Sequence, residues 1–199
     1  MKSGSLFVIS GPSGTGKGTI CKHLIRRIDA ELSVSMTTRI PRAEEVEGVS
    51  YFFVTDADFD KEISEGGLLE YANVYGNRYG TPKAPVCAHL KNGKDVILEI
   101  DIQGALQVKQ NFPEGIFIFI LPPSIEELRQ RIRGRGSETD ASIALRLSEA
   151  RKEIEFIREY DYYVINDVLE DAVANVEAIT RAVKARVDAE SLTILEQYR

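Results

Sequence analysis

Glycines and one lysine form the most distinctive stretch of this sequence, residues 11–19, which reads Gly-Pro-Ser-Gly-Thr-Gly-Lys-Gly-Thr. The spacing Gly-x4-Gly-Lys is typical of a phosphate-binding loop, whose backbone N–H groups surround phosphate oxygens while the lysine reaches the outer phosphates. An apolar run at residues 6–9 predicts a strand before it, and residues 20–25 have helical apolar spacing after it. A plain glycine-rich turn with an exposed lysine is the alternative. Our candidates for binding a nucleoside triphosphate are Gly11, Pro12, Ser13, Gly14, Thr15, Gly16, Lys17, Gly18 and Thr19.

Gly18 departs from the usual form of this loop, in which a serine or threonine follows the lysine directly. Thr19 comes one position too late to supply the hydroxyl that binds Mg²⁺ in many such proteins. We therefore expect no direct protein ligand for the metal. Phosphates and water should hold Mg²⁺, an ion that keeps several of its waters.

Composition limits the class of protein. The 199 residues suffice for one domain with a sizeable core, and 43% hydrophobic with 28% charged residues indicate a soluble protein. A net charge of −6 argues against nucleic acid as the main partner. Cys21 and Cys87 predict reduced core thiols rather than a disulfide framework. No apolar run approaches the roughly 20 residues of a membrane span, so we expect a cytoplasmic protein without membrane contact.

Apolar runs predict five core strands at residues 6–10, 32–36, 96–100, 116–121 and 162–165. They are nearly continuous, as in strands covered on both faces. Helical patterns lie between them: Ser124 and Glu127 have capping-box spacing, and residues 142–160 and 169–187 predict two long helices. Thr81-Pro82 predicts an N-cap followed by a first-turn proline. The expected fold class is α/β, with a five-stranded parallel sheet and helices on both faces.

Residues 34–93 interrupt this alternation. Short strands are predicted at residues 51–54 and 68–71, and helices at residues 59–64 and 85–91, which indicates a small, partly antiparallel α+β subdomain. Residues 134–139 are glycine-rich and polar and predict a mobile lid. We predict one domain over residues 4–187, with a core of residues 4–33, 94–133 and 146–187, an insertion of residues 34–93, a lid of residues 134–145, and a C-terminal tail of residues 188–199.

Arg39 and Arg42 follow the second predicted core strand. Pro41 keeps residue 40 extended, so the two arginines should project from an ordered loop and not from one face of a helix. Two guanidinium groups there can bind a phosphate bidentately. A solvated basic loop is the alternative.

Several further motifs follow along the chain: Ser35-x-Thr37-Thr38-Arg39-x-Pro41-Arg42, Tyr51, Glu70, Tyr79-Gly80-Thr81, Glu99-Ile100-Asp101-Ile102-Gln103-Gly104 and Arg133-Gly134-Arg135-Gly136-x-Glu138-Thr139. In their order and spacing, from about residue 5 to residue 182, they closely resemble the guanylate kinase family. The resemblance implies a P-loop nucleoside-monophosphate-kinase fold and transfer of phosphate from ATP to GMP, with dGMP as a further expected acceptor. It implies Arg39, Arg42, Tyr51 and Tyr79 at the GMP phosphate, and Ser35, Glu70, Thr81 and Asp101 at the guanine.

The chemistry of guanine agrees with these residue types. Guanine offers an N1–H and a 2-amino group that one carboxylate, such as Glu70, can accept together, and its O6 accepts from a hydroxyl. Adenine lacks both donors and would leave buried acceptors unpaired, which can discriminate by about 10⁴ or more. A surface acid ending a strand is the alternative for Glu70, and a core aromatic is the alternative for Tyr51 and Tyr79.

Glu99 and Asp101 end a predicted apolar strand and point to one face. One acid can orient metal-bound water while the other reads the base; we favour Asp101 at the nucleotide and leave the pair open. Asp101-x-x-Gly104 also matches a switch element of GTPases, although no Asn-Lys-x-Asp motif follows.

Arg131 and Arg135 belong to a run of four arginines without an acid, and are four residues apart. The resemblance implies that Arg135 and Arg146 close on the transferred phosphate, that Arg131 assists them, and that Asn166 lies near the adenine of ATP. Val168 stands where the family usually has a second acid. A solvated helix face is the alternative for the arginines.

No general base is needed for this reaction, because a monophosphate has a second pKa near 6 and is largely deprotonated at pH 7. The predicted catalytic side chains are Lys17, Arg131, Arg135 and Arg146, with Mg²⁺. Two alternatives remain: a non-catalytic guanylate-kinase-like domain that binds phosphorylated partners, and a kinase for another small phosphate acceptor. The complete loop with Lys17 speaks against the first, and Glu70 against the second.

Overall fold

The computed structural model describes residues 3–74, 76–134 and 140–187, together with residues 192, 195 and 198. Five strands form a parallel sheet in the order β2–β7–β1–β8–β9. Their bounds are β1 Leu6–Ser10, β2 Ala30–Leu32, β7 Asp95–Glu99, β8 Ile116–Leu121 and β9 Tyr162–Ile165. The expected α/β fold with a five-stranded parallel sheet is therefore confirmed.

Helices cover both faces of this sheet because alternate strand residues point to opposite sides. Phe7 and Ile9 pack with α1 (Lys17–Leu24) and α7 (Leu169–Lys184). Leu6 and Val8 pack on the other face with α3 (Lys83–Lys91) and α4 (Ile102–Asn111). Cys21 lies in the first of these clusters, as predicted, whereas Cys87 is only partly buried.

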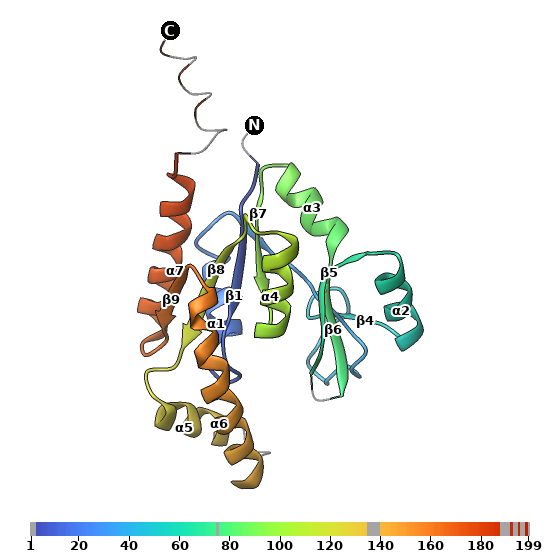
Figure 1. The fold of residues 1–199 in the computed structure, drawn as a ribbon, viewed down its shortest axis with the longest axis vertical. Coiled ribbons are helices and arrows are strands. Elements are labelled where there is room, and N and C mark those ends of the chain that lie inside the picture. Colours follow the sequence, from blue (N-terminus) through green and yellow to red (C-terminus); the bar gives the residue numbers. More distant parts are fainter. Residues whose placement is uncertain are drawn as a thin grey trace.

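A second sheet has the order β4–β3–β6–β5, with β3 Met36–Thr37, β4 Phe52–Phe53, β5 Leu68–Val74 and β6 Asn77–Pro82. Its β3–β6 and β5–β6 pairs are antiparallel and its β3–β4 pair is parallel. Helix α2 (Asp56–Ser64) belongs to the same part of the chain. Helices α5 (Ile125–Arg133) and α6 (Asp140–Ile154) pack on each other through Leu128, Ile132, Ile143 and Leu147. In Figure 1, the small sheet and α2 lie to the right of the core sheet, and the α5–α6 pair lies below the core sheet.

Three details of the sequence prediction were wrong. Residues 32–36 do not form one strand: β2 ends at Leu32 in the core sheet, and β3 begins at Met36 in the small sheet. Thr81 is not an N-cap, because it lies in β6 and Pro82 precedes α3 without a side-chain cap. The long helix ends at Ile154 and continues as a 3-10 helix over Glu155–Glu159, and α7 ends at Lys184.

Ser124 does cap α5, since its hydroxyl accepts from the Glu127 N–H at 3.0 Å. The Glu127 carboxylate binds Arg131. Within the described residues, no helix is both long enough and apolar enough to cross a bilayer.

Candidate active site

The phosphate loop joins the buried end of β1 to α1. Gly16 adopts a φ of 89° and caps α1, and Gly11 has a φ of 141°. A Cβ at Gly11 would lie 2.3 Å from the Ile120 carbonyl oxygen, so only glycine fits between loop and β8. The loop therefore presents the first N–H groups of α1 at the carboxyl edge of the sheet.

Lys17 folds back over this loop. Its ammonium donates to the carbonyl oxygens of Gly11 at 2.6 Å and Pro12 at 3.0 Å. Burial lowers the pKa of Lys17, while the charges of Glu99 and Glu153 oppose that shift. The cation is thus held by the backbone beside the N-terminus of α1.

The Glu99 side chain, at the end of β7, lies close to Gly18 of the phosphate loop. A Cβ at Gly18 would lie 3.0 Å and 3.2 Å from the two carboxylate oxygens of Glu99. Burial raises the pKa of Glu99, opposed by the charge of Lys17. The Glu99 carboxylate is thus a close neighbour of the first turn of α1. Among the described residues no group of three or more acids, histidines or cysteines could bind a metal.

The Asn166 side chain binds the backbone of the phosphate loop. It is buried (6% exposed), and its amide donates to the Thr15 carbonyl at 2.8 Å. The backbone carbonyl of Asn166 accepts from Arg131 at 2.9 Å, and Arg131 also donates to the Glu127 carboxylate at 2.9 Å. The end of β9, the phosphate loop and α5 are thereby connected by one chain of hydrogen bonds.

Arg39 lies among aromatic rings in the loop after β3. Its Nε donates to the Tyr79 hydroxyl at 3.2 Å, and its guanidinium lies 5.5 Å from the Tyr51 ring centroid. The two tyrosine rings meet edge to face at 5.9 Å. Burial raises the pKa of Tyr51, and the charge of Glu99 adds to the increase. Three of the four residues predicted at the GMP phosphate are therefore in contact.

Glu45 completes this cluster, and sequence reasoning missed it. Its carboxylate accepts from Arg39 at 2.8 and 3.0 Å and from the Arg42 N–H at 2.8 Å. Arg42 is exposed. No sequence signal separates Glu45 from the neighbouring acids Glu44 and Glu47.

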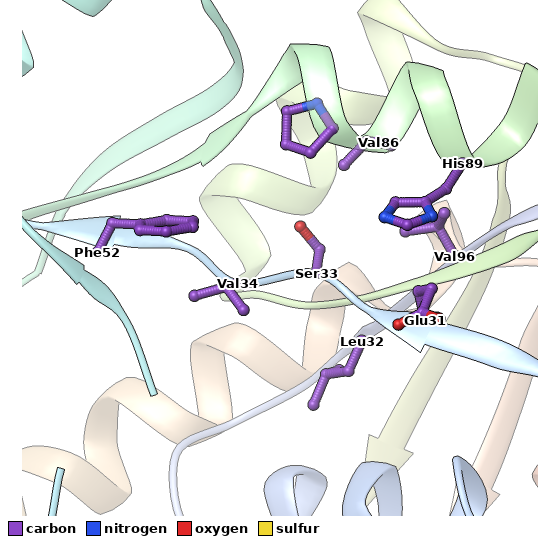
Figure 2. Close-up of a pocket in the computed structure, with 9 residues that line it drawn as sticks. Glu31, Leu32, Ser33, Val34, Phe52, Val86, His89 and Val96 are labelled. Carbon is purple, nitrogen blue, oxygen red and sulfur yellow. The ribbon is translucent and has the colours of Figure 1, made fainter. Parts of the chain in front are cut away.

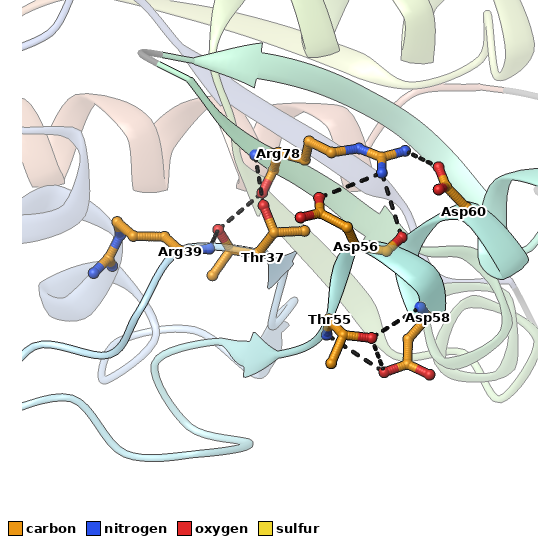
Figure 3. Close-up of polar contacts among 8 residues, drawn as sticks. Thr37, Arg39, Thr55, Asp56, Asp58, Asp60 and Arg78 are labelled. Atoms are coloured by element: carbon orange, nitrogen blue, oxygen red, sulfur yellow. Dashed lines mark hydrogen bonds and ion pairs between the residues drawn. The ribbon is translucent and has the colours of Figure 1, made fainter.

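Arg78 fixes the segment that carries Arg39. Its carbonyl accepts from the Thr37 hydroxyl at 2.8 Å, and the same hydroxyl accepts from the Arg39 N–H at 3.1 Å (Figure 3). The Arg78 guanidinium donates to Asp60 at 2.7 Å and lies 4.4 Å from the Phe59 ring centroid, so it joins β6 to α2. The loop with Arg39 is therefore bound to the small sheet.

Glu70 lies on β5 facing the start of α4. It is buried (5% exposed), which excludes a surface acid, and its carboxylate accepts from the Thr81 hydroxyl at 2.6 Å. Burial raises the pKa of Glu70 to about 7; the Thr81 hydrogen bond opposes this and the charge of Asp101 adds to it. Asp101 caps α4 by accepting from the Gly104 N–H at 2.8 Å. The structure thus brings Glu70, Thr81 and Asp101 together. Among the described residues, Ser35 forms no hydrogen bond with these three.

The lid arginines are only partly described. Arg131 lies in α5 as predicted, Arg146 is half-buried in α6, and Arg135 lies outside the described residues. Sequence reasoning also missed Glu153, which follows Arg146 by seven residues on α6 and whose charge acts on Lys17. Burial raises the pKa of Glu153, opposed by Lys17. The seven-residue spacing, which puts both side chains on one helix face, was the available signal.

A cavity of about 220 Å³ lies where the chain crosses from β2 to β3. Figure 2 shows the residues that line it. Its lining residues are Glu31, Leu32, Ser33, Val34, Phe52, Pro85, Val86, His89 and Val96. None of the sequence-predicted site residues lines this cavity, so it is separate from the site described above.

Known proteins resemble this chain over nearly its whole length. The family model described as guanylate kinase matches residues 3–183. A guanylate kinase of Clostridium acetobutylicum is 60% identical over 94% of this chain and 90% of its own length. One of Clostridioides difficile is 50% identical over 100% of this chain and 98% of its own. The crystal structure of guanylate kinase from Anaplasma phagocytophilum superposes with a TM-score of 0.79 at 32% identity, covering 94% of this chain and 89% of that one. The site contains the phosphate loop, the cluster of Arg39 with Tyr51 and Tyr79, and the buried Glu70. The chain that carries them belongs to the guanylate kinase family.

Proposed function

We propose that this chain, as a guanylate kinase, binds ATP on the phosphate loop and GMP between the small sheet and α4. The observation that carries the proposal is the carboxyl end of β7. There Glu99 lies against Gly18 of the phosphate loop, and Asp101 opens α4, whose Gly104 faces the Glu70 carboxylate. A donor phosphate at Lys17 and an acceptor at Glu70 would therefore flank the same short segment.

The acceptor site divides into two parts by chemistry. Arg39, Arg42, Tyr51 and Tyr79 are the proposed contacts of the GMP phosphate, because guanidinium and phenol groups donate to phosphate oxygens. Glu70, Thr81, Asp101 and Ser35 are the proposed contacts of guanine. A carboxylate at Glu70 would accept from N1–H and the 2-amino group, which AMP lacks. Glu45 would hold Arg39 in place through its two hydrogen bonds.

Phosphoryl transfer then depends on position and charge rather than on a base. The attacking oxygen of GMP is largely deprotonated at neutral pH. Lys17, with Arg131, Arg135 and Arg146, would neutralise the negative charge between donor and acceptor. Bound Mg²⁺ would supply further charge neutralisation on the phosphates, with Glu99 or Asp101 accepting from its waters. Core, insertion and lid, as divided in the sequence prediction, would close to exclude water.

A coupled assay with ATP and equal concentrations of GMP, dGMP, AMP and UMP tests the acceptor. We expect kcat/KM for GMP to exceed that for AMP by about 10⁴, and dGMP to be used as well. Equal rates on AMP would remove the guanine-reading role of the Glu70 pocket. A chain that binds GMP without turning over ATP would instead be the non-catalytic kind of domain.

A further inference from the structure

Gly104, in the first turn of α4, leaves room for the Glu70 carboxylate. A Cβ at position 104 would lie 2.4 Å from Glu70 Oε2 and 2.9 Å from its carboxyl carbon. These separations are far below van der Waals contact, so one of the two groups would have to move. The carboxylate of Glu70 thus occupies the space that any other residue at 104 would fill.

The Glu70 side chain is directed to this place from the strand side. The register of β5 against β6 shifts between Leu68 and Glu70, an irregularity that re-aims a side chain. The other carboxylate oxygen accepts from Thr81 at 2.6 Å. Glu70 is therefore fixed between β6 and α4.

Helix α4 is fixed against β5 as well. The Gln107 amide donates to the Tyr71 carbonyl at 2.7 Å and accepts from the Tyr71 N–H at 3.1 Å, and Asn111 donates to the Leu69 carbonyl at 3.3 Å. These bonds lie one and two turns after Gly104. Because the helix cannot retreat without breaking them, a side chain at 104 would displace Glu70 instead.

We propose that Gly104 is a specificity-determining positioning residue: its missing side chain lets Glu70 hold the orientation that reads guanine. This rests on the proposed function of Glu70. It also gives the Asp101-x-x-Gly104 motif a role other than that of a GTPase switch, in which the glycine N–H must be available to a phosphate. Here that N–H donates to Asp101 at 2.8 Å.

The test is Gly104→Ala, with Gln110→Ala on the exposed face of α4 as a control. Alanine has a higher helix propensity than glycine. If residue 104 affected only the helix, Gly104→Ala should therefore raise the stability of α4 or leave it unchanged. We expect KM for GMP to rise about tenfold or more, KM for ATP to stay within about twofold, and the preference for GMP over AMP to fall. The control should keep all three values. A Gly104→Ala enzyme with wild-type KM for GMP would overturn the inference.

A double-mutant cycle with Glu70→Asp separates a contact from two independent effects. Shortening the acid by one methylene withdraws the carboxylate, so Glu70→Asp should cost less GMP affinity in the Gly104→Ala background than in the wild type. Additive losses would overturn the inference. Should Gly104→Ala alone be insoluble, Glu70→Asp must restore folded protein, and failure to do so would overturn it too. A wild-type chain that does not phosphorylate GMP would instead refute the proposed function.

Discussion

Lys17 lies between opposing electrostatic influences. Burial lowers its pKa, and the carboxylates of Glu99 and Glu153 offset part of that cost. Two carbonyl oxygens accept from the ammonium, so its position is set by the loop before any nucleotide arrives. A preorganised cation of this kind acts on charge that develops during transfer, and not on the binding of the acceptor.

Replacing Lys17 by alanine should therefore lower kcat by about 10³ or more, while calorimetry should give a GMP affinity close to that of the wild type. Lys22→Ala, an exposed lysine on α1, is the matched control and should keep full activity. Loss of GMP binding in the Lys17 variant would mean that the two nucleotide positions are wrongly assigned.

Glu70 predicts how GMP binding responds to pH. Because burial raises the pKa of Glu70 to about 7, its carboxyl is protonated below that pH and ionised above it. In the proposed role of Glu70, the ionised form would accept from both guanine donors, whereas the protonated form would present a hydrogen to them. KM for GMP should therefore rise as the pH falls from 8 to 6, about tenfold per pH unit below the pKa.

The phosphate of GMP titrates in the same range, so Glu70→Gln provides the reference. Its KM for GMP should be raised at every pH and should change only as the phosphate titrates, with KM for ATP unchanged. A wild-type profile parallel to that of Glu70→Gln would contradict the role of Glu70.

Residue types predicted Lys17, Arg39 and Glu70, because each has a chemistry that its motif needs. Glu45 and the packing role of Gly104 escaped prediction for a physical reason. The carboxylate of Glu45 is distinguished from its neighbours only by the direction in which the loop turns. The need for glycine at 104 arises from a side chain 34 positions earlier, brought there by the packing of α4 on β5.

At the scale of elements, the continuous apolar runs gave four of the five core strands correctly. Burial on both faces leaves such strands no polar positions, so the pattern is strong. Residues 32–36 were predicted as one strand because Leu32, in the core sheet, and Met36, in the small sheet, are both apolar. The change from one sheet to the other therefore leaves no signal in the hydrophobic pattern. Thr81 was predicted to be an N-cap, but its hydroxyl donates to Glu70, its cross-strand partner on β5, a pairing that the local sequence does not show.

The segment after β9 allows a test between two roles of Asn166. If its amide supports the loop through the Thr15 carbonyl, Asn166→Ala and the isosteric Asn166→Asp should both raise KM for every triphosphate donor by a similar factor. If Asn166 instead contacts adenine, the variants should change the preference among ATP, GTP and UTP. We expect the first outcome, about tenfold or more for each donor, since removing a buried hydrogen bond costs about 1–3 kcal/mol. Donor-dependent factors would restore the adenine contact.

At the scale of the whole molecule, the two sheets meet at β7 and α4. Strand β7 of the core sheet ends in Glu99 beside the phosphate loop, and α4 begins three residues later against β5 of the small sheet. The charge of Asp101 reaches both sides. Burial is the largest cause of both shifts: it lowers the pKa of Lys17 and raises the pKa of Glu70. The charge of Asp101 raises both pKa values. Because Glu99 lies against Gly18 and Gly104 faces the Glu70 carboxylate, a donor at the phosphate loop and an acceptor at Glu70 would flank the same short segment.

A compound with adenosine and guanosine linked through five phosphates tests this arrangement. If one chain binds both ends, calorimetry should give one compound per chain and a dissociation constant about 10² or more below that of either ATP or GMP, since the second contact becomes intramolecular. The melting temperature should rise accordingly. The diadenosine compound of equal length is the control and should bind no better than ATP, because its second base lacks the donors that Glu70 accepts. Glu70→Gln should remove most of the difference between the two compounds. Two guanosine compounds per chain, or equal affinity for both compounds, would show that the phosphate loop and the Glu70 pocket do not serve one reaction.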